Sequence, residues 1–328
     1  MFSFIRILFQ IAWQVAVNYF YYRQYFKHSF QNYLYRSDGT LTAKDIKRMK
    51  FFAIFIPVML GDGFSLLREK KMSVDERIMM MSFSAATPLF DDFFDDNNLS
   101  VQHLEQLFIE QDKYQPKNSK EQIFIEILLS LQPTIHQPEK FIALCLAIFN
   151  AQKAALAQVS NKNISWDELK QISLAKCSAS AVLFWSLLKD DDTSAEKMVV
   201  RQVGNLIQYT DDVFDLWFDL QEGTQTVATN AKSIVLLEND FKAEWKKLLV
   251  AVGQLPINHF NQQKFIKLQW FFFSRTFVAL EQLKKLPFAH DDFNPLSFTR
   301  QQLVCDMEKW RNRIKWVRYY SGGNDAIK

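Results

Sequence analysis

The stretch Gly204–Gly223 places four aspartates inside an otherwise apolar and aromatic part of the chain. At about 3.6 residues per turn, Asp211, Asp215 and Asp219 fall on one face of a helix. Three like charges on one stripe repel one another, and an apolar helix does not carry them without compensation. The spacing therefore predicts a cation beside this helix. Mg²⁺ suits the position because it prefers oxygen ligands and shares them with substrate phosphates.

The scarcity of turn-forming residues predicts an all-α fold. Eight Gly and eight Pro in 328 residues favour long helices with short connections over a many-stranded sheet. The net charge of +3 and the 48% of hydrophobic residues are typical of a soluble protein, and nothing indicates a nucleic-acid partner. Cys145, Cys177 and Cys305 stand alone in apolar patterns, which predicts buried thiols in a reducing, cytoplasmic location.

The first 40 residues form an apolar segment rich in aromatic side chains. Gln10, Gln14 and Asn18 recur every four residues, which predicts a polar stripe on an amphipathic helix. Neither a basic leader nor a small-residue cleavage site is visible in this segment. We expect an N-terminal arm over residues 1–40 that packs on one domain formed by residues 41–328. The sequence leaves open a peripheral contact of the arm with a membrane surface, and a homodimer.

Capping signals mark the expected starts of the longer helices. The capping residues expected at these starts are Thr42, Ser73, Ser100, Ser165 and Thr193. The helix that begins after Thr193 is expected to continue without a break to Gly223. The uninterrupted apolar run Pro138–Val159 is expected to be a central core helix.

A second acid cluster lies upstream, in the sequence FDDFFDD at Phe90–Asp96. Both clusters fall on predicted helices between aromatic residues, whereas Asp190–Asp192 falls in a predicted loop. Two facing walls of carboxylates can hold Mg²⁺ ions with a diphosphate between them, and the metal neutralises charge on the leaving group. If an allylic hydrocarbon remains, its carbocation needs a dry aromatic pocket. The candidates for the wall of this pocket are Phe94, Phe184, Trp185, Phe214 and Trp217.

These motifs resemble those of the class I terpenoid synthase superfamily, which groups trans-isoprenyl diphosphate synthases, terpene cyclases and squalene or phytoene synthases. The run Asp91–Asp95 is similar to the first DDxxD motif. The second motif, GxxxQxxDDxxD, is matched by Gly204, Gln208, Asp211, Asp212 and Asp215. The alternative motif of terpene cyclases, with spacing i, i+4, i+8, is matched by Asp211, Asp215 and Asp219, although Asp replaces Ser or Thr at its middle position.

Two shorter matches resemble the diphosphate-binding residues of this superfamily. Lys176 is similar to the lysine of its KT motif, with Cys177 in place of Thr. Arg318 and Tyr319 are similar to its C-terminal RY pair. The resemblance implies that Lys176, Gln208, Arg318 and Tyr319 bind diphosphate.

The resemblance also implies the fold and the metal site. The implied fold is a bundle of about ten helices around a central cavity. The implied cofactor is Mg²⁺, with as many as three ions. The implied metal ligands are Asp91, Asp92, Asp95, Asp211, Asp212, Asp215 and Asp219, of which Asp91, Asp95, Asp211 and Asp215 are the expected catalytic set.

The predicted function is a Mg²⁺-dependent class I terpene synthase that ionises a prenyl diphosphate and then cyclises or eliminates. In chain-elongating members of the superfamily an arginine pair follows the first motif. Asn97–Ser100 stands there in this chain, so the resemblance favours ionisation followed by cyclisation or elimination over chain elongation. In chain-elongating members of the superfamily, bulky residues four and five positions before the first motif shorten the product. Thr87 and Ala86 stand at these positions, so the resemblance implies a prenyl chain of C20 or above. Two alternatives remain: a prenyltransferase that joins two prenyl units, and a non-catalytic helical protein associated with a membrane.

Overall fold

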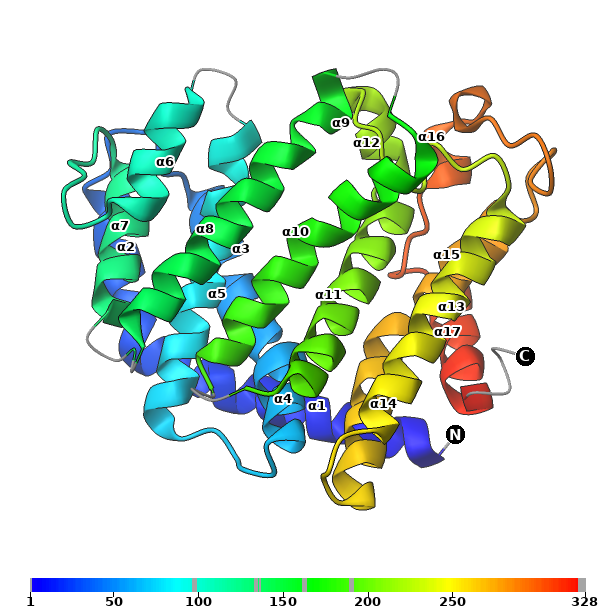
Figure 1. Cartoon of the computed structure of the whole chain (residues 1–328), viewed down its shortest axis with the longest axis horizontal. Coiled ribbons are helices and arrows are strands. Elements are labelled where there is room, and N and C mark those ends of the chain that lie inside the picture. Colours follow the sequence, from blue (N-terminus) through cyan, green and yellow to red (C-terminus); the bar gives the residue numbers. More distant parts are fainter. Residues whose placement is uncertain are drawn as a thin grey trace. The chain divides into compact units, whose positions relative to one another are not determined.

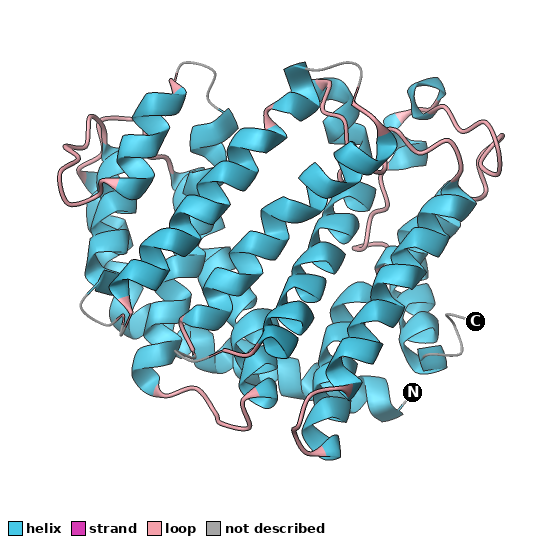
Figure 2. Ribbon diagram, viewed as in Figure 1, coloured by secondary structure: helices cyan, strands magenta, loops and turns pink. Residues whose placement is uncertain are grey.

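The structure of the chain is a computed structural model that describes residues 2–95, 99–132, 135, 137–160, 164–188 and 192–323. Within these ranges the chain forms helices and loops and no strand, which confirms the all-α class (Figure 2). The chain divides into two compact units. Unit 1 comprises Met1–Leu8, Ala154–Ala181 and Thr193–Lys328, and unit 2 comprises Phe9–Lys153 and Val182–Asp192. The boundary expected near residue 40 does not appear in this division.

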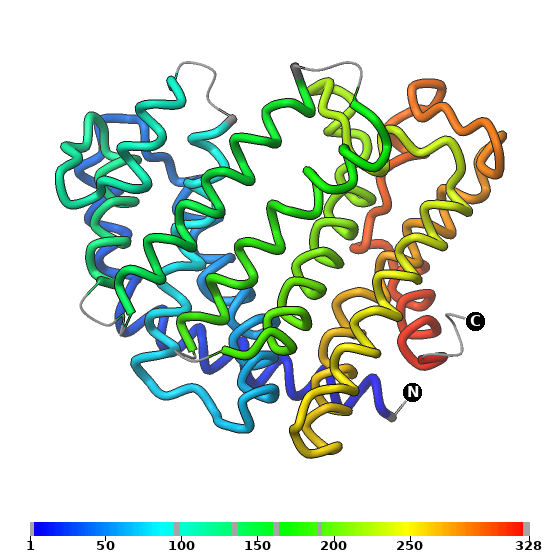
Figure 3. Tube along the Cα trace, viewed as in Figure 1, coloured from blue at the N-terminus to red at the C-terminus, as the bar shows by residue number. Residues whose placement is uncertain are grey.

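Unit 2 is built mainly from the N-terminal half of the chain, as the blue to green part of Figure 3 shows. Several of its helices begin at the predicted capping residues, where side-chain oxygens accept the free backbone N–H groups of the first turn. Its elements are α1 (Phe2–Tyr21, of which the first turns belong to unit 1), η1 (Tyr22–Phe26), α2 (Lys27–Tyr35), α3 (Ala43–Ile56), η2 (Pro57–Gly61), α4 (Asp62–Leu67), α5 (Val74–Asp95), α6 (Val101–Ile109), α7 (Ser119–Leu131) and α8 (Pro138–Ala155).

The polar stripe of α1 meets the interior of unit 2 at Asn18, which is fully buried. The Asn18 amide donates to the carbonyl of Ile54 at 2.8 Å, and its oxygen accepts from Arg77 at 2.6 Å. Arg77 also bonds Asp62 at 2.9 Å, so the buried charge has a partner. The amphipathic reading of α1 is therefore wrong at this position, because the polar side chain points inward and much of the exposed face is apolar.

Two long apolar segments differ in how deeply they are buried. The helical stretch Ala43–Leu67 continues through Gly61 by a π-helical turn, and 56% of its most apolar window is buried. For Pro138–Val159 only 22% is buried, so this segment is a surface helix and not the expected core helix. Both are long and apolar enough by composition to cross a membrane, a property that a core helix shares.

Unit 1 is organised around α11, which packs against α13, α14 and α15. In Figure 1, α10 and α11 run side by side through the green part of the chain. Its elements are α9 (Ala157–Ser160), α10 (Trp166–Ser186, whose last residues belong to unit 2), α11 (Ser194–Phe214), α12 (Leu216–Glu222), α13 (Ile234–Gly253), α14 (His259–Phe273), α15 (Thr276–Leu283), η4 (Pro295–Ser297), α16 (Arg300–Leu303) and α17 (Trp310–Gly322).

A charged cluster around Glu281 ties α15 to α17 within unit 1. The Glu281 carboxylate contacts Lys285 and Lys315, each at 2.8 Å, and accepts a hydrogen bond from Tyr319 at 3.2 Å. Burial raises the pKa of Glu281, but the hydrogen bonds from the two lysines outweigh it and lower the pKa to about 2. The carboxylate is therefore more acidic in the folded chain than the ordinary value of 4.5.

This cluster predicts a pH-dependent contribution to stability. Because the folded-state pKa is lowered, the ionised Glu281 stabilises the protein fully above about pH 4.5, and this contribution disappears as the pH falls toward 2. We expect Glu281→Gln to lower the free energy of unfolding by about 1–2 kcal/mol at pH 7. Urea unfolding at several pH values measures the difference from wild type, which should shrink below pH 4.5. The exposed Glu308→Gln is the control, and an equal effect of both substitutions would contradict the assignment.

Candidate functional site

The aspartates of the opening motif lie where α11 passes into α12. The Thr193–Glu196 capping box starts α11 as predicted, and Gly223, with φ of 72°, closes α12. The helix is not continuous, because Asp215 has φ −95° and ψ 7° and separates the two helices. The backbone N–H of Asp215 still bonds the carbonyl of Asp211 at 2.8 Å, and that of Asp219 bonds the carbonyl of Asp215 at 2.9 Å. The three aspartates thus remain about one turn apart across the break.

The first residue of the second motif, Gly204, permits a close crossing of α10 and α11. A Cβ atom at this position would lie 2.4 Å from the Cα of Ser178 and 2.5 Å from the carbonyl oxygen of Cys177. Both neighbours are backbone atoms of α10, so neither can rotate away. The glycine therefore serves packing, and the close approach puts Lys176 of α10 next to the acid cluster of α11.

The carboxylates of α11 and α12 are close enough to perturb one another. Burial raises the pKa of Asp219 to about 8, with further contributions from Asp212, Asp211 and Asp215. The side chain of Asp211 is in contact with solvent, but many protein atoms surround its carboxylate. This burial, followed by the charge of Asp215, raises the pKa of Asp211 to about 6. The pKa of Asp215 is also raised, by burial and then by Glu222. The structure thus brings the four aspartates of the motif together.

Asp212 is held by the protein itself. Its carboxylate is buried and accepts hydrogen bonds from the Gln208 amide at 2.7 Å and from the backbone N–H of Val227 at 3.3 Å. Gln208 in turn accepts from the thiol of Cys177 at 3.2 Å. Gln208 therefore positions Asp212, and its expected contact with diphosphate stays a prediction. Asp219, the last residue of the i, i+4, i+8 spacing, also has a protein partner, because the Thr226 side chain hydrogen-bonds its carboxylate.

Two cations face this cluster, and one of them was missed in the sequence. Lys176 lowers the pKa values of Asp211 and Asp212, as the resemblance implies for a neighbouring cation. Arg275, at the start of α15, opposes Asp211 and Asp215, and its guanidinium lies 5.3 Å from the ring centre of Phe214. The signal that could have identified Arg275 is a single cation inside the aromatic run WFFFSRTF.

The remaining predicted residues of unit 1 have other surroundings. Tyr319 bonds Glu281 and stacks on Phe277, with 5.6 Å between the ring centres. Arg318 is exposed one position before it. Trp217 is half-buried on α12, and Phe214 lies under Arg275. Of the two aromatic candidates on α11 and α12, Phe214 therefore has a contact with Arg275, one of the two cations beside the aspartates.

The first acid cluster lies at the end of α5 in unit 2. Asp91 is half-buried and accepts from the Gln152 amide of α8 at 3.1 Å. Asp92 points elsewhere and forms ion pairs with Arg48 at 2.6 Å and Lys120 at 3.1 Å. These two cations give Asp92 a structural role in joining α5 to α3 and α7. The side chain of Asp95, and the stretch from 96 to 98, lie outside the described residues.

The aromatic candidates of unit 2 belong to its packed core. Phe184 meets the edge of Phe83 at 5.0 Å between ring centres, and the fully buried Trp185 meets Phe64 at 5.7 Å. Phe94 is also buried, in an aromatic cluster at the end of α5. The other members of that cluster include Phe90, Phe93, Phe108, Phe124 and Phe149.

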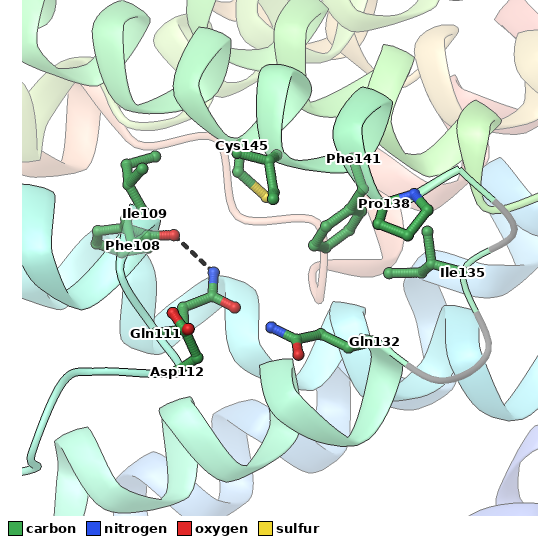
Figure 4. A pocket seen from close by; sticks show the side chains of 10 residues that line it. Phe108, Ile109, Gln111, Asp112, Gln132, Ile135, Pro138, Phe141 and Cys145 are labelled. Atoms are coloured by element: carbon green, nitrogen blue, oxygen red, sulfur yellow. Dashed lines mark hydrogen bonds between the residues drawn. The ribbon is translucent and has the colours of Figure 1, made fainter.

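An open pocket of about 320 Å³ borders this aromatic cluster in unit 2 (Figure 4). Phe141 and Cys145 of α8 form one side, and Gln111 and Gln132 lie across from them. The Gln111 amide donates to the carbonyl of Phe108 at 2.6 Å, and Phe108, which lines the pocket, also packs its ring against Phe90 and Phe94. Burial raises the pKa of the Cys145 thiol to about 12, which keeps it neutral and unreactive. The pocket suits an apolar group with a polar end.

The acid cluster of unit 1 is compatible with Mg²⁺, although it is not a complete set of ligands. In the described part of the chain, no three His, Cys, Asp or Glu side chains gather around one point as they would for a bound ion. Mg²⁺ is commonly held by one or two carboxylates and completed by waters and substrate phosphates. Asp211, Asp215 and Asp219 offer carboxylate oxygens, and Lys176 and Arg275 are the cations near Asp211.

The chain matches no family model, no curated protein and no solved structure. By its own geometry it is an all-α protein in which two cations lie beside a carboxylate cluster on α11 and α12.

Proposed function

We propose that the protein is a magnesium-dependent class I terpene synthase that acts on a prenyl diphosphate. The observation that carries this proposal is that Asp211 and Asp215 raise the pKa of Asp219, while Lys176 lies near Asp211 and Arg275 lies near Asp211 and Asp215. Acids that raise one another's pKa favour a divalent cation, while a lysine and an arginine beside them favour an anion. A metal diphosphate is a ligand that satisfies both demands.

The residues of this chain have separable roles in the proposed reaction. Bound Mg²⁺ would neutralise charge on the diphosphate as it leaves. Asp211, Asp215 and Asp219 would hold the metal, and Lys176 and Arg275 would contact the diphosphate oxygens. Departure of diphosphate breaks one carbon–oxygen bond and leaves an allylic carbocation. This cation then closes rings or loses a proton to give a terpene.

Binding of Mg²⁺ and inorganic diphosphate tests the site without any substrate. A ligand at a hundred times its dissociation constant stabilises the folded protein by about 2.7 kcal/mol, so we expect the thermal midpoint to rise by several degrees. The rise should require both components and should be lost in Asp211→Asn/Asp215→Asn. Arg275→Gln should reduce it, because the diphosphate loses a charged partner, whereas Arg201→Gln, on the exposed side of α11, should not. An unchanged midpoint in wild type would reject the site.

A product screen tests the reaction and separates it from the alternatives. Purified protein is incubated with Mg²⁺ and prenyl diphosphates from C10 to C35, with and without isopentenyl diphosphate. Release of diphosphate with a hydrocarbon or alcohol product supports the proposal. A product that forms only with isopentenyl diphosphate, or by joining two substrates, supports a prenyltransferase. No release from any substrate favours the non-catalytic alternative. Asp91→Asn in the same assay tests whether the first acid cluster contributes.

A further inference from the structure

An exposed aromatic stripe runs along α1 in unit 2. Phe9, Trp13 and Phe20 are 73%, 69% and 63% exposed. At about 100° per residue these three positions fall within an arc of about 40° on the helix, opposite the buried Asn18. Single exposed apolar residues are ordinary, but three large aromatic side chains aligned on one helix mark a surface that contacts something other than water.

The neighbouring helix α3 carries a second group of exposed aromatic side chains. Asn18 of α1 bonds the backbone of Ile54, and the Lys50 ammonium lies 5.2 Å from the ring centre of Tyr19, so the two helices are in contact. The exposed face of α3 carries Phe51 and Phe55, whose rings stack at 4.5 Å. Exposed aromatic residues therefore lie on both helices of this contact. We use the name aromatic face for Phe51 and Phe55 of α3 together with Phe9, Trp13 and Phe20 of α1.

The segment that carries the aromatic face is strongly basic in sequence. Residues 1–61 contain eight Lys and Arg but only two acidic residues, whereas the whole chain contains 39 and 36. Lys47 and Lys44 lie about one and two turns before Phe51 on the exposed side of α3, and Arg23 and Lys27 are exposed just beyond α1. Both acids are engaged elsewhere: Asp38 bonds Thr40, and Asp45 lies in the capping box of α3 and near Lys120.

We propose that the aromatic face of α1 and α3 docks the protein on the surface of an anionic lipid bilayer. Trp, Tyr and Phe suit the boundary between headgroups and hydrocarbon, and lysine and arginine attract anionic headgroups. A second copy of the chain fits less well, because a two-fold contact through this face would place its basic residues against one another. The inference rests on unit 2 alone and is independent of the proposed reaction.

Flotation of the full-length protein with vesicles tests this docking. Wild type should bind vesicles that contain phosphatidylglycerol and should bind pure phosphatidylcholine several-fold more weakly. Each exposed aromatic side chain that leaves water contributes about tenfold to binding, so Phe9→Ala/Trp13→Ala should weaken it by tenfold or more. Lys44→Gln/Lys47→Gln should weaken binding to anionic vesicles only, by about fivefold for each charge.

A matched double variant on unit 1 provides the control. Phe260 and Trp310 are 63% and 72% exposed, so Phe260→Ala/Trp310→Ala removes the same two side-chain types at similar exposure. Its binding should equal that of wild type. The proposal is overturned if wild type binds neither vesicle, if both double variants bind alike, or if the aromatic face proves to be a dimer contact. That last outcome would be a wild-type dimer in sedimentation that Phe9→Ala/Trp13→Ala dissociates, without vesicle binding. The comparison of wild-type binding to the two kinds of vesicle needs no variant, so it remains a test even if a variant fails to fold.

Discussion

Replacing Asp211 with asparagine is expected to reduce the rate of diphosphate release by about 10³-fold or more. Asp211 belongs to both motifs that the sequence matches, and it lies between Asp215, Lys176 and Arg275. Its loss would remove a metal ligand and change the charge balance of the cluster without changing side-chain volume. The measurement is diphosphate release from the best substrate of the product screen, at saturating Mg²⁺. This prediction applies only if the protein catalyses the proposed reaction. The binding of Mg²⁺ with diphosphate described above can be tested without any substrate.

The control for this substitution is Asp292→Asn, which makes the same chemical change at an exposed loop position of unit 1. It should leave the rate unchanged.

The neighbours of Asp211 distinguish the two motifs. Because the oxygens of Asp212 accept from Gln208 and Val227, Asp212→Asn should mainly reduce stability, whereas Asp219→Asn should mainly reduce rate. Equal rates for wild type, Asp211→Asn and Asp219→Asn would remove this cluster from the reaction.

Replacing Gly204 with alanine is expected to destabilise the protein by about 3 kcal/mol. An alanine normally stabilises a helix relative to glycine by about 0.5–1 kcal/mol. Here the added Cβ would lie 2.4 Å from the Cα of Ser178 and 2.5 Å from the carbonyl oxygen of Cys177. The α10 and α11 backbones must then separate, which would also move Lys176 away from the carboxylates. Urea unfolding measures the stability, and the binding of Mg²⁺ with diphosphate measures the displacement.

Gly253 provides the matched control, because it also lies in a helix and a Cβ there would have no neighbour within 4 Å. Gly253→Ala should be neutral or should stabilise the protein by a few tenths of a kcal/mol to about 1 kcal/mol. A Gly204→Ala protein as stable as Gly253→Ala would show that the α10–α11 crossing adjusts easily. The explanation of the motif glycine as a packing residue would then be wrong.

Much of the local structure was predictable because it depends on neighbours in the sequence. The capping boxes at Thr42, Ser73 and Thr193 form as expected, since each involves side chains three residues apart. The left-handed Gly223 ends α12 for a similar local reason. The break at Asp215 was not predicted, because the aspartate spacing suits a continuous helix equally well.

The sequence by itself determined an all-α chain, the starts of several helices, and the spacing that keeps Asp211, Asp215 and Asp219 about one turn apart. It did not determine which side of each helix would be buried. Helical periodicity shows which residues share a face, but the partner of that face comes from distant parts of the chain. Only the tertiary structure decided that Asn18 is buried, and that Arg275 lies beside the carboxylates while Asp212 is held by Gln208 and Val227. Burial and charge act between residues that are close in space, and for these residues that closeness depends on how the helices pack.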